Sequence, residues 1–381
     1  MVERVTRKNE NLESELPLTI SAQYGLIDQN EFFDKRIASR DVSGYYLLKK
    51  GEFAYNKSTS SDAPWGAVKR LDRYEMGVLS TLYIVFALKE DGNIDSDFLV
   101  SYYDTDCWHK GVQAIAAEGA RNHGLLNITP ADYFETVLTV PSDVKEQHQI
   151  GTFFAKLDTL ITLHQRKYDK LVQFKASMLE NLFPKNGSNK PKIRFDGFTD
   201  AWEQRKFGDL GSVAMCKRIF KEQTTATGEI PFYKIGTFGG EPDAFISRDL
   251  FEEYKAKFSY PEVGDMLISA SGTIGRTVEY TGKDEYFQDS NIVWFKHDDR
   301  IDNSFLRCLY SIVEWSGIEG STIKRLYNDN FLKTEFMLPC VAEQRKVGSF
   351  FSQLDHLITL HQRKLEKLKQ FKAAMLEKMF V

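Results

Sequence analysis

Two polar stretches of this 381-residue sequence carry side chains suited to contacts with nucleic acid. The first, AYNKSTSSDAPWGAVKR, mixes amide, hydroxyl and basic residues with Tyr55 and Trp65. The second has two parts: SASGTIGR, a glycine turn that ends in Arg276, and STIKRL, which places Lys324 beside Arg325. Small hydroxyl side chains and backbone amides can approach phosphates closely, and Arg, Lys, Asn and Gln can contact base edges. Each stretch alone is more typical of a solvated loop, but their presence in two separate blocks favours binding.

The candidate DNA contacts are the basic, amide, hydroxyl and aromatic residues in and near these stretches. They are Gln23, Tyr24, Asn56, Lys57, Ser58, Thr59, Lys69, Arg70, Lys217, Arg218, Lys234, Ser271, Thr273, Arg276, Lys324 and Arg325.

Sequence motifs of catalysis are absent. There is no P-loop, no GxSxG nucleophile motif, no HExxH zinc motif and no GxGxxG turn between a strand and a helix. The stretch DAPW lacks one proline of the Asp-Pro-Pro-aromatic motif of amino-methyltransferases, and no SAM-binding glycine motif precedes it. The histidines show no metal-ligand spacing. We therefore expect neither a catalytic site nor a metal site. The cysteines form no CxxC pair, and we expect buried, reduced thiols at Cys107, Cys216, Cys308 and Cys340.

Charge and hydropathy limit the class of protein. The formal net charge is -4, so a DNA-binding surface has to be local, with acidic residues elsewhere on the molecule. The N-terminal residues contain no apolar run of signal-peptide length, and no later run approaches the length of a membrane span. The sequence predicts a cytoplasmic protein.

One long segment occurs twice. LDTLITLHQRK begins at Leu157 and LDHLITLHQRK begins at Leu354, inside an ungapped alignment of Glu146–Phe183 with Glu343–Phe380 in which most positions are identical. Apolar residues recur in alternating steps of four and three, which predicts long helices over 142–184 and 340–381. The predicted helix–helix seam consists of Leu157, Ile161, His164, Tyr168, Leu171, Leu354, Ile358, His361, Leu365 and Leu368.

Each of these helices would expose its apolar stripe unless the other covers it, and a two-fold pairing of related helices makes them antiparallel. Phe153, Leu160, Leu163 and Phe174 widen the stripe, and we expect this flank to pack on a globular domain. Whether His164 and His361 do more than fill the seam stays open.

The rest of the chain forms two unlike blocks, 1–141 and 193–339, separated by a polar linker at 185–192. Alternating apolar runs predict strands at LPLTISAQYG, YYLLKKGEFAYN and TLYIVFAL in the first block, followed by a helix at DFLVSYYDTDCW. In the second block, EIPFYKIGTF, GDMLISASG and NIVWFKH read as strands and NSFLRCLYSIVEWS as a helix. The predicted fold class is mixed α/β: two similar globular domains separated by two long antiparallel coiled-coil helices with pseudo-two-fold symmetry.

This order of variable block and repeated helix resembles the specificity subunit of type I restriction-modification systems. The matching pieces are RFDGFTDAWEQRKFGDL at the start of the second block, VGDMLISASGTIGR inside it, and the segment from LPCVAEQRK to the last helix with its first copy. The resemblance covers essentially the whole chain. It implies that each block is a target recognition domain for one half of a bipartite double-stranded DNA site, and that the helices act as a ruler between them.

The same resemblance implies partners and cofactors. Two modification subunits would bind the helices, carry SAM and methylate adenine N6, and restriction subunits that use ATP and Mg would join them; this chain itself would hold no cofactor. For the partner surface we expect Gln165, Arg166, Lys167, Gln362, Arg363 and Lys364.

The first block departs from the family pattern at one point, and a second function is also compatible with the sequence. The first block opens at MVERVTRKN, which aligns just after the RFDGFTDAWEQRKFGDL segment, so the first block has no counterpart of that segment. We expect an added extension of this type to stabilise the first domain. The alternative function is a coiled-coil scaffold whose globular domains bind proteins without a DNA role.

Overall fold

The computed structural model of the chain describes residues 1–21, 24–61, 63–116, 124–185, 187–318 and 324–380. The chain divides into two compact units. Unit 1 comprises Met1–Gln165 with Arg363–Val381, and unit 2 comprises Arg166–Gln362. Each long helix therefore contributes one part to each unit. None of the described helices is long and apolar enough to cross a membrane.

Unit 1 is built on an antiparallel sheet in the order β1-β8-β5-β6. Its strands are β1 (Val2–Arg4), β8 (Ile84–Leu88), β5 (Phe53–Asn56) and β6 (Ala67–Arg70). Two further pairs are β2 (Leu18–Ser21) with β3 (Gly25–Asp28), and β4 (Tyr46–Lys49) with β7 (Met76–Leu79). The short helices are α1 (Gln29–Phe33), α2 (Ser96–Tyr103), α3 (His109–Ile115) and α4 (Pro130–Phe134).

Unit 2 contains an antiparallel sheet in the order β10-β16-β13-β14. These strands are β10 (Gly211–Ala214), β16 (Ile292–His297), β13 (Met266–Ser269) and β14 (Thr277–Glu279). A second sheet joins β12 (Phe245–Ile246), β11 (Ile230–Tyr233) and β15 (Tyr286–Phe287), and β9 (Glu203–Lys206) pairs with β17 (Glu335–Leu338). The helices are α6 (Arg248–Lys257), α7 (Asn303–Tyr310) and α8 (Asn328–Lys333), with short 3-10 turns at Phe207–Asp209 and Lys221–Gln223.

The main sheets of the two units share one topology. In each, the first strand pairs with the last, the last pairs with a middle strand, and that strand pairs with the edge strand that follows it in sequence. The helix after the last strand, α2 or α7, begins with an aspartate N-cap, Asp95 or Asp302. The two blocks are thus copies of one fold although their sequences differ.

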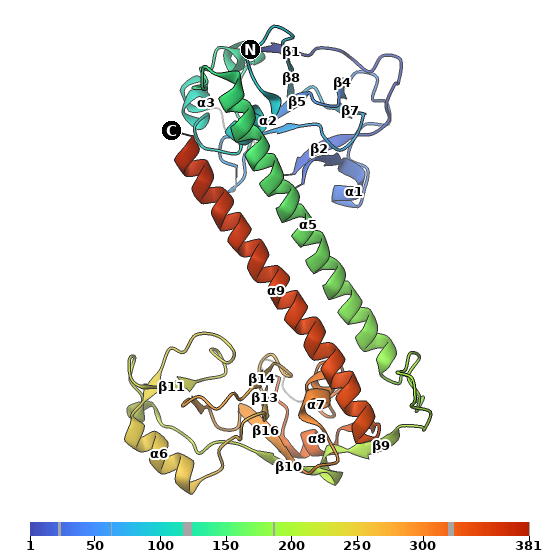
Figure 1. Cartoon of the computed structure of the whole chain (residues 1–381), viewed down its shortest axis with the longest axis vertical. Helices are drawn as coiled ribbons and strands as arrows, with labels where there is room; N and C mark the ends of the chain where they lie inside the picture. The colour runs from blue at the N-terminus through green and yellow to red at the C-terminus, as the bar shows by residue number, and fades with distance from the viewer. Residues whose placement is uncertain (22–23, 62, 117–123, 186, 319–323, 381) are drawn as a thin grey trace. The chain divides into compact units, whose positions relative to one another are not determined.

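Helices α5 (Val144–Leu182) and α9 (Val341–Met379) are each continuous (Figure 1). In unit 1 their contacts are Phe153–Phe371 at 6.3 Å and Phe154–Phe380 at 5.9 Å between ring centroids, and Asp158–Lys372 at 2.7 Å. In unit 2 they are Phe350–Phe174 at 6.2 Å, Phe351–Phe183 at 6.5 Å and Asp355–Lys175 at 2.6 Å. In unit 1 the start of α5 meets the end of α9, and in unit 2 the end of α5 meets the start of α9, so the pairing is antiparallel. Each pair in one unit has its repeat equivalent in the other.

The antiparallel pairing and the mixed α/β class predicted from the sequence are confirmed. The ten predicted seam residues are all buried or half-buried. The expected packing of the flank on a globular domain is confirmed for Phe153, which packs against the core of unit 1. It is wrong for Leu160, Leu163 and Phe174, which are 43%, 47% and 47% exposed. The cysteine prediction holds in part: Cys216 and Cys308 are buried, and burial raises the pKa of each thiol to about 12, whereas Cys107 and Cys340 are exposed.

The predicted strands and helices of the blocks coincide with β2, β4, β5, β8 and α2 in unit 1 and with β11, β13, β16 and α7 in unit 2. The helices begin and end within the predicted ranges 142–184 and 340–381. The compact units cut across the predicted segment boundaries, since each unit takes part of both helices.

Candidate nucleic-acid interface and helix surface

A buried glutamine near the start of each long helix joins the globular block that precedes the helix to that helix. The Gln344 side chain is fully buried; its Oε1 accepts from the Asp302 amide at 2.8 Å, and its Nε2 donates to the carbonyls of Arg300 and Pro339, each at 2.9 Å. All three partners are backbone groups just before α7 or α9. One side chain therefore joins the segment before α7 to the segment before α9.

Gln147, the equivalent residue in the first copy of the repeat, makes the same contacts. Gln147 is 1% exposed, its Oε1 accepts from the Asp95 amide at 2.9 Å, and its Nε2 donates to Pro141 at 2.8 Å and to Asn93 at 3.4 Å. The repeated Glu-Gln pair was visible in the sequence, but its role was not, because its partners are backbone groups of the variable blocks.

One glycine in each long helix allows the block's helix to cross it closely. A Cβ at Gly151 would lie 2.4 Å from the Phe98 amide nitrogen and 2.6 Å from the Asp97 carbonyl carbon. A Cβ at Gly348 would meet Ser304, including its backbone carbonyl carbon at 2.7 Å. Because the opposing atoms are backbone, no side-chain rotation relieves the clash. The glutamine and the glycine together set the orientation of each block on its helix.

In unit 2, three predicted DNA contacts converge on the turn Gln288–Asn291 between β15 and β16. Asp289 accepts from Arg218 Nε at 2.9 Å, Ser290 Oγ accepts from an Arg325 terminal nitrogen at 3.0 Å, and Asn291 Oδ1 accepts from Ser271 Oγ at 2.9 Å. The turn is itself anchored by Gln288, whose Oε1 accepts from the Ile235 amide at 2.8 Å. Residues far apart in sequence thus form one polar cluster, which we call the 288–291 cluster.

The backbone of this turn is strained, which fixes its shape. Ser290 has a φ of 52°, in the left-handed region that L side chains rarely adopt. The Ser271 and Arg325 segments are joined by an isolated bridge, and the Gly272 amide donates to the Lys324 carbonyl at 3.0 Å. The turn is therefore held by hydrogen bonds from three separate segments, those of Arg218, Ser271 and Arg325. Asp289, Ser290 and Asn291 were missed at the sequence level; a Gln-Asp-Ser-Asn turn between two strands was the available signal.

A hollow of about 660 Å³ adjoins the cluster. Its polar lining consists of Ser290, Arg325, Tyr327, Asn328, Asp329, Asn330 and Lys333, so two cations and one carboxylate face it. The Arg325 guanidinium lies 5.4 Å from the centroid of the Tyr327 ring. Arg325 is held by a neutral hydroxyl, so that contact leaves its charge uncompensated. Amide donors, cations and an aromatic face around a hollow are the groups that contact phosphates, base edges and bases.

The remaining predicted contacts of unit 2 lie in varied surroundings. Lys234 pairs with Asp243 at 2.8 Å, and the Lys217 ammonium lies 5.0 Å from the Phe258 ring centroid. Arg276 donates to the Phe238 carbonyl at 2.9 Å, and the Thr273 carbonyl accepts from Ser269 Oγ. The structure does not bring these four residues onto the 288–291 turn.

In unit 1, the predicted contacts Asn56–Thr59 hold a neighbouring loop. Thr59 donates twice to the Gly124 carbonyl, from its amide at 2.7 Å and its hydroxyl at 3.1 Å, and Lys57 Nζ donates to Ile128 at 3.3 Å. Asn56 Oδ1 accepts from the Ser58 amide at 3.0 Å. Tyr24 is 56% exposed, and Gln23 lies outside the described residues.

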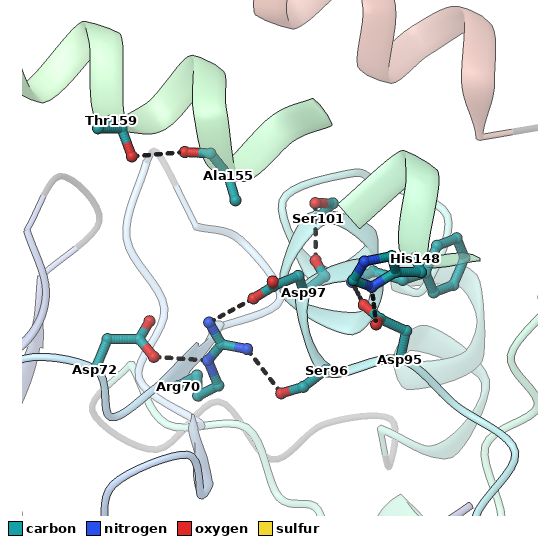
Figure 2. Close-up of polar contacts among 10 residues, drawn as sticks. Arg70, Asp72, Asp95, Ser96, Asp97, Ser101, His148, Ala155 and Thr159 are labelled. Carbon is teal, nitrogen blue, oxygen red and sulfur yellow. Dashed lines mark hydrogen bonds and ion pairs between the residues drawn. The ribbon is translucent and has the colours of Figure 1, made fainter. Parts of the chain in front are cut away.

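Lys69 and Arg70 are engaged within unit 1. Figure 2 shows Arg70 between three acceptors: its guanidinium lies 2.7 Å from Asp72, 2.7 Å from Ser96 and 2.8 Å from Asp97. The same view shows His148 of α5 against Asp95 at 3.0 Å. These contacts place Arg70 as an anchor for the start of α2.

Lys69 belongs to a chain of ion pairs. Asp104 lies 2.6 Å from Lys69 and 2.8 Å from Lys372, and Lys372 lies 2.7 Å from Asp158. Burial raises the pKa of Asp104, but the two ammonium groups outweigh it and hold that pKa below its usual range. This network joins β6, the end of α2, α5 and α9 inside unit 1, so a structural role accounts for Lys69.

The predicted partner surface lies on the helices. Arg166, Lys167, Arg363 and Lys364 are exposed, as is Gln362, while Gln165 is half-buried. Exposed apolar residues accompany them in equivalent sets: Leu160, Leu163 and Phe371 in unit 1, and Leu357, Leu360 and Phe174 in unit 2. Sequence analysis had assigned part of this flank to intramolecular packing.

Comparison with known proteins identifies the second block. A family model described as the type I restriction modification DNA specificity domain matches residues 199–370. Over these residues the chain is similar to a type I restriction-modification DNA specificity domain. The matched segment contains the 288–291 cluster, β10–β17 and most of α9.

A relative by sequence and two solved structures are also similar to the chain. A Haemophilus influenzae protein named as a type I restriction enzyme specificity subunit is 54% identical over 153 residues, which are 40% of this chain and 40% of that protein. The S subunit of a type I restriction-modification system from M. genitalium has the same fold, with a TM-score of 0.55 at 15% identity over 100% of this chain and 96% of that one. The HsdS subunit from Thermoanaerobacter tengcongensis gives 0.41 at 16% identity over 100% and 93%, too distant a fit to add to the argument.

Proposed function

We propose that the chain is the DNA-specificity subunit of a type I restriction-modification complex. Each globular block would read one half of a bipartite double-stranded DNA site, and the two helices would space the blocks. The observation that carries the proposal is that the sheet topology of the specificity domain at 199–370 recurs in unit 1. Two DNA-reading domains in one chain discriminate better between DNA sequences than one, because the free-energy cost of each mismatched base pair adds roughly to the others.

In this proposal the 288–291 cluster is the contact surface of the second block. Arg325 would contact a phosphate or a base edge beside the hollow, and the Tyr327 ring below it restricts where its guanidinium points. Arg218 and Ser271 would act mainly by fixing the turn, because each already bonds to a residue of it. The chain would be non-catalytic and cytoplasmic, with SAM held by modification subunits, and ATP and Mg by restriction subunits.

DNA binding is tested by titrating the chain with duplex DNA at rising salt. If phosphates are contacted, log K falls linearly with log salt. Arg325→Ala should weaken binding by about 1–3 kcal/mol if it contacts a base, or reduce the salt slope by about 1 if it contacts a phosphate. Lys257→Ala is the matched control, because Lys257 is an exposed α6 cation paired with Glu253 at 2.9 Å. A flat salt response, or equal effects of both substitutions, would favour the protein-binding scaffold.

The helices would bind two copies of one partner, the modification subunit. Support comes from the exposed leucine pairs, Leu160 with Leu163 and Leu357 with Leu360, which occur at equivalent positions of the repeat. Exposed apolar side chains grouped on one surface are typical of interaction sites. Identical surfaces suit identical partners, whereas the unlike blocks suit an asymmetric DNA site.

Charge reversal tests this partner surface. Arg166→Glu combined with Arg363→Glu should weaken assembly with the purified modification subunit, measured by sedimentation, while the free chain keeps its unfolding midpoint. Leu163→Ser with Leu360→Ser should do the same through lost apolar burial. Full-strength assembly by both double variants would exclude this stretch of the helices as the binding surface.

A further inference from the structure

The 288–291 cluster of unit 2 has a counterpart in unit 1, and backbone contacts define its position. An isolated bridge joins Ser271 to Arg325 in unit 2, and the same kind of bridge joins Ser58 to Leu125 in unit 1. In each unit the amide that follows the second bridge residue donates to the carbonyl that precedes the first, at 2.8 Å in unit 2 and 3.0 Å in unit 1. Leu125 therefore occupies the position of Arg325, and Ser58 occupies that of Ser271.

The turn ahead of the last sheet strand has a counterpart as well. Strand β16 begins at Ile292 and lies between β10 and β13, and strand β8 begins at Ile84 and lies between β1 and β5. Ser290 and Leu82 each lie two residues before the first residue of the strand that follows them. Leu82 is 56% exposed, so an exposed leucine stands where unit 2 carries the hydroxyl that accepts from Arg325.

Two leucines in place of a serine and an arginine change what this surface can contact. The Arg325 guanidinium offers charged donors, which suit phosphates and the O6 and N7 acceptors of guanine. In unit 1 the cations Lys57 and Lys69 are engaged by acceptors of the unit itself. An apolar side chain makes no hydrogen bond to a base edge, and its favourable contact in the major groove is the C5-methyl group of thymine. An exposed leucine at this position therefore favours thymine.

We propose that Leu82 contacts the C5-methyl group of a thymine in the half-site read by unit 1, whereas Arg325 contacts the other half-site from the equivalent region of unit 2. This assignment rests on the proposed function and adds the chemistry of base recognition to it. Ser58 is exposed and supplies a hydroxyl to the phosphate backbone, as small polar side chains do at such interfaces. One fold thus reads two unlike half-sites, with an apolar contact in one unit and a charged donor in the other.

The first test removes the methyl group from the DNA and leaves the protein unchanged. Duplexes are selected from a random pool by the full chain and are remade with deoxyuridine in place of each thymidine in turn, which deletes only the C5-methyl group. The parent chain should lose about fourfold in affinity when one particular thymine of one half-site is replaced, as expected for one buried methyl group.

The second test assigns this loss to Leu82. Leu82→Ala should bind the thymine and uracil forms of that duplex equally, because the side chain that contacts the methyl group is gone. Leu12→Ala is the matched control: Leu12 is also a leucine of unit 1, is 52% exposed, and lies outside the turn and the bridge, so this variant should keep the fourfold difference. Arg325→Ala should keep the difference too, while it weakens or relaxes binding at the other half-site.

The outcomes separate this proposal from the proposed function. It is overturned if no uracil replacement lowers the affinity of the parent chain, or if Leu82→Ala keeps the full difference; in both cases the chain still binds DNA, and the proposed function stands. It is also overturned if Leu82→Ala weakens only assembly with the purified modification subunit, because Leu82 would then belong to a protein-binding surface. If the full chain selects no bipartite site from the pool, the proposed function and this proposal fail together.

Discussion

Replacing Gln344 by leucine should destabilise unit 2 more than any surface change on the same helix. The substitution keeps the volume but removes one acceptor and one donor from a fully buried site, leaving the Asp302 amide and the carbonyls of Arg300 and Pro339 without this partner. Each unsatisfied buried group costs about 1–3 kcal/mol. After a small gain from the added apolar surface, we expect a net loss of about 4 kcal/mol in the free energy of unfolding.

Urea unfolding followed by far-UV circular dichroism measures this loss. Gln353→Leu is the matched control, because Gln353 lies on the same helix and is exposed, so its replacement should change the free energy by less than about 0.5 kcal/mol. Hydrogen exchange should locate the loss at the start of α7 and α9. A Gln344→Leu variant whose free energy of unfolding lies within about 1 kcal/mol of the parent's would refute the idea that the Gln344 hydrogen bonds join the globular block to the helix.

Two other predictions concern unit 1. Gly151→Ala should cost about 2–3 kcal/mol of unfolding free energy because its Cβ meets backbone atoms, whereas Gly44→Ala, with nothing within 4 Å of the added Cβ, should be close to neutral in the same urea experiment. The depressed pKa of Asp104 means that its ion pairs stabilise the unit above the unfolded carboxyl pKa of about 4 and lose that contribution as the pH falls through the lower folded value. Asp104→Asn should therefore lower stability at neutral pH and flatten its fall in acid; an unchanged acid limb would contradict this assignment.

The repeat and its periodicity predicted the long helices and their buried seam, because both depend on local sequence pattern. Leu157 and Leu354 are buried because heptad spacing places them on one face of each helix, and the sequence shows that spacing directly. The exposed Leu160 and Leu163 could not be distinguished from core residues by the same rule, because whether a helix flank is covered depends on what packs there.

Long-range pairing explains the rest of the differences. Lys69 and Arg70 look like DNA contacts in sequence, but Asp104 and Asp97 reach them only once α2 packs against β6. Conversely, Arg218, Ser271 and Arg325 gain significance as a group because the Asp289–Asn291 turn collects them. A single sequence gives the residue types of a site. Which of its charged side chains form ion pairs with other residues, and which are left to contact a ligand, depends on the fold.

Methylation mapping of the source genome, with and without this gene, tests the central claim most directly. If the chain specifies a bipartite DNA site, deletion should remove adenine methylation from one asymmetric two-part motif and leave every other methylated motif intact. Restoring the gene with Arg325→Ala should relax the half of the motif read by unit 2 if Arg325 contacts a base, and should lower methylation of the unchanged motif if it contacts a phosphate. A deletion strain that keeps all of its methylated motifs would contradict the account.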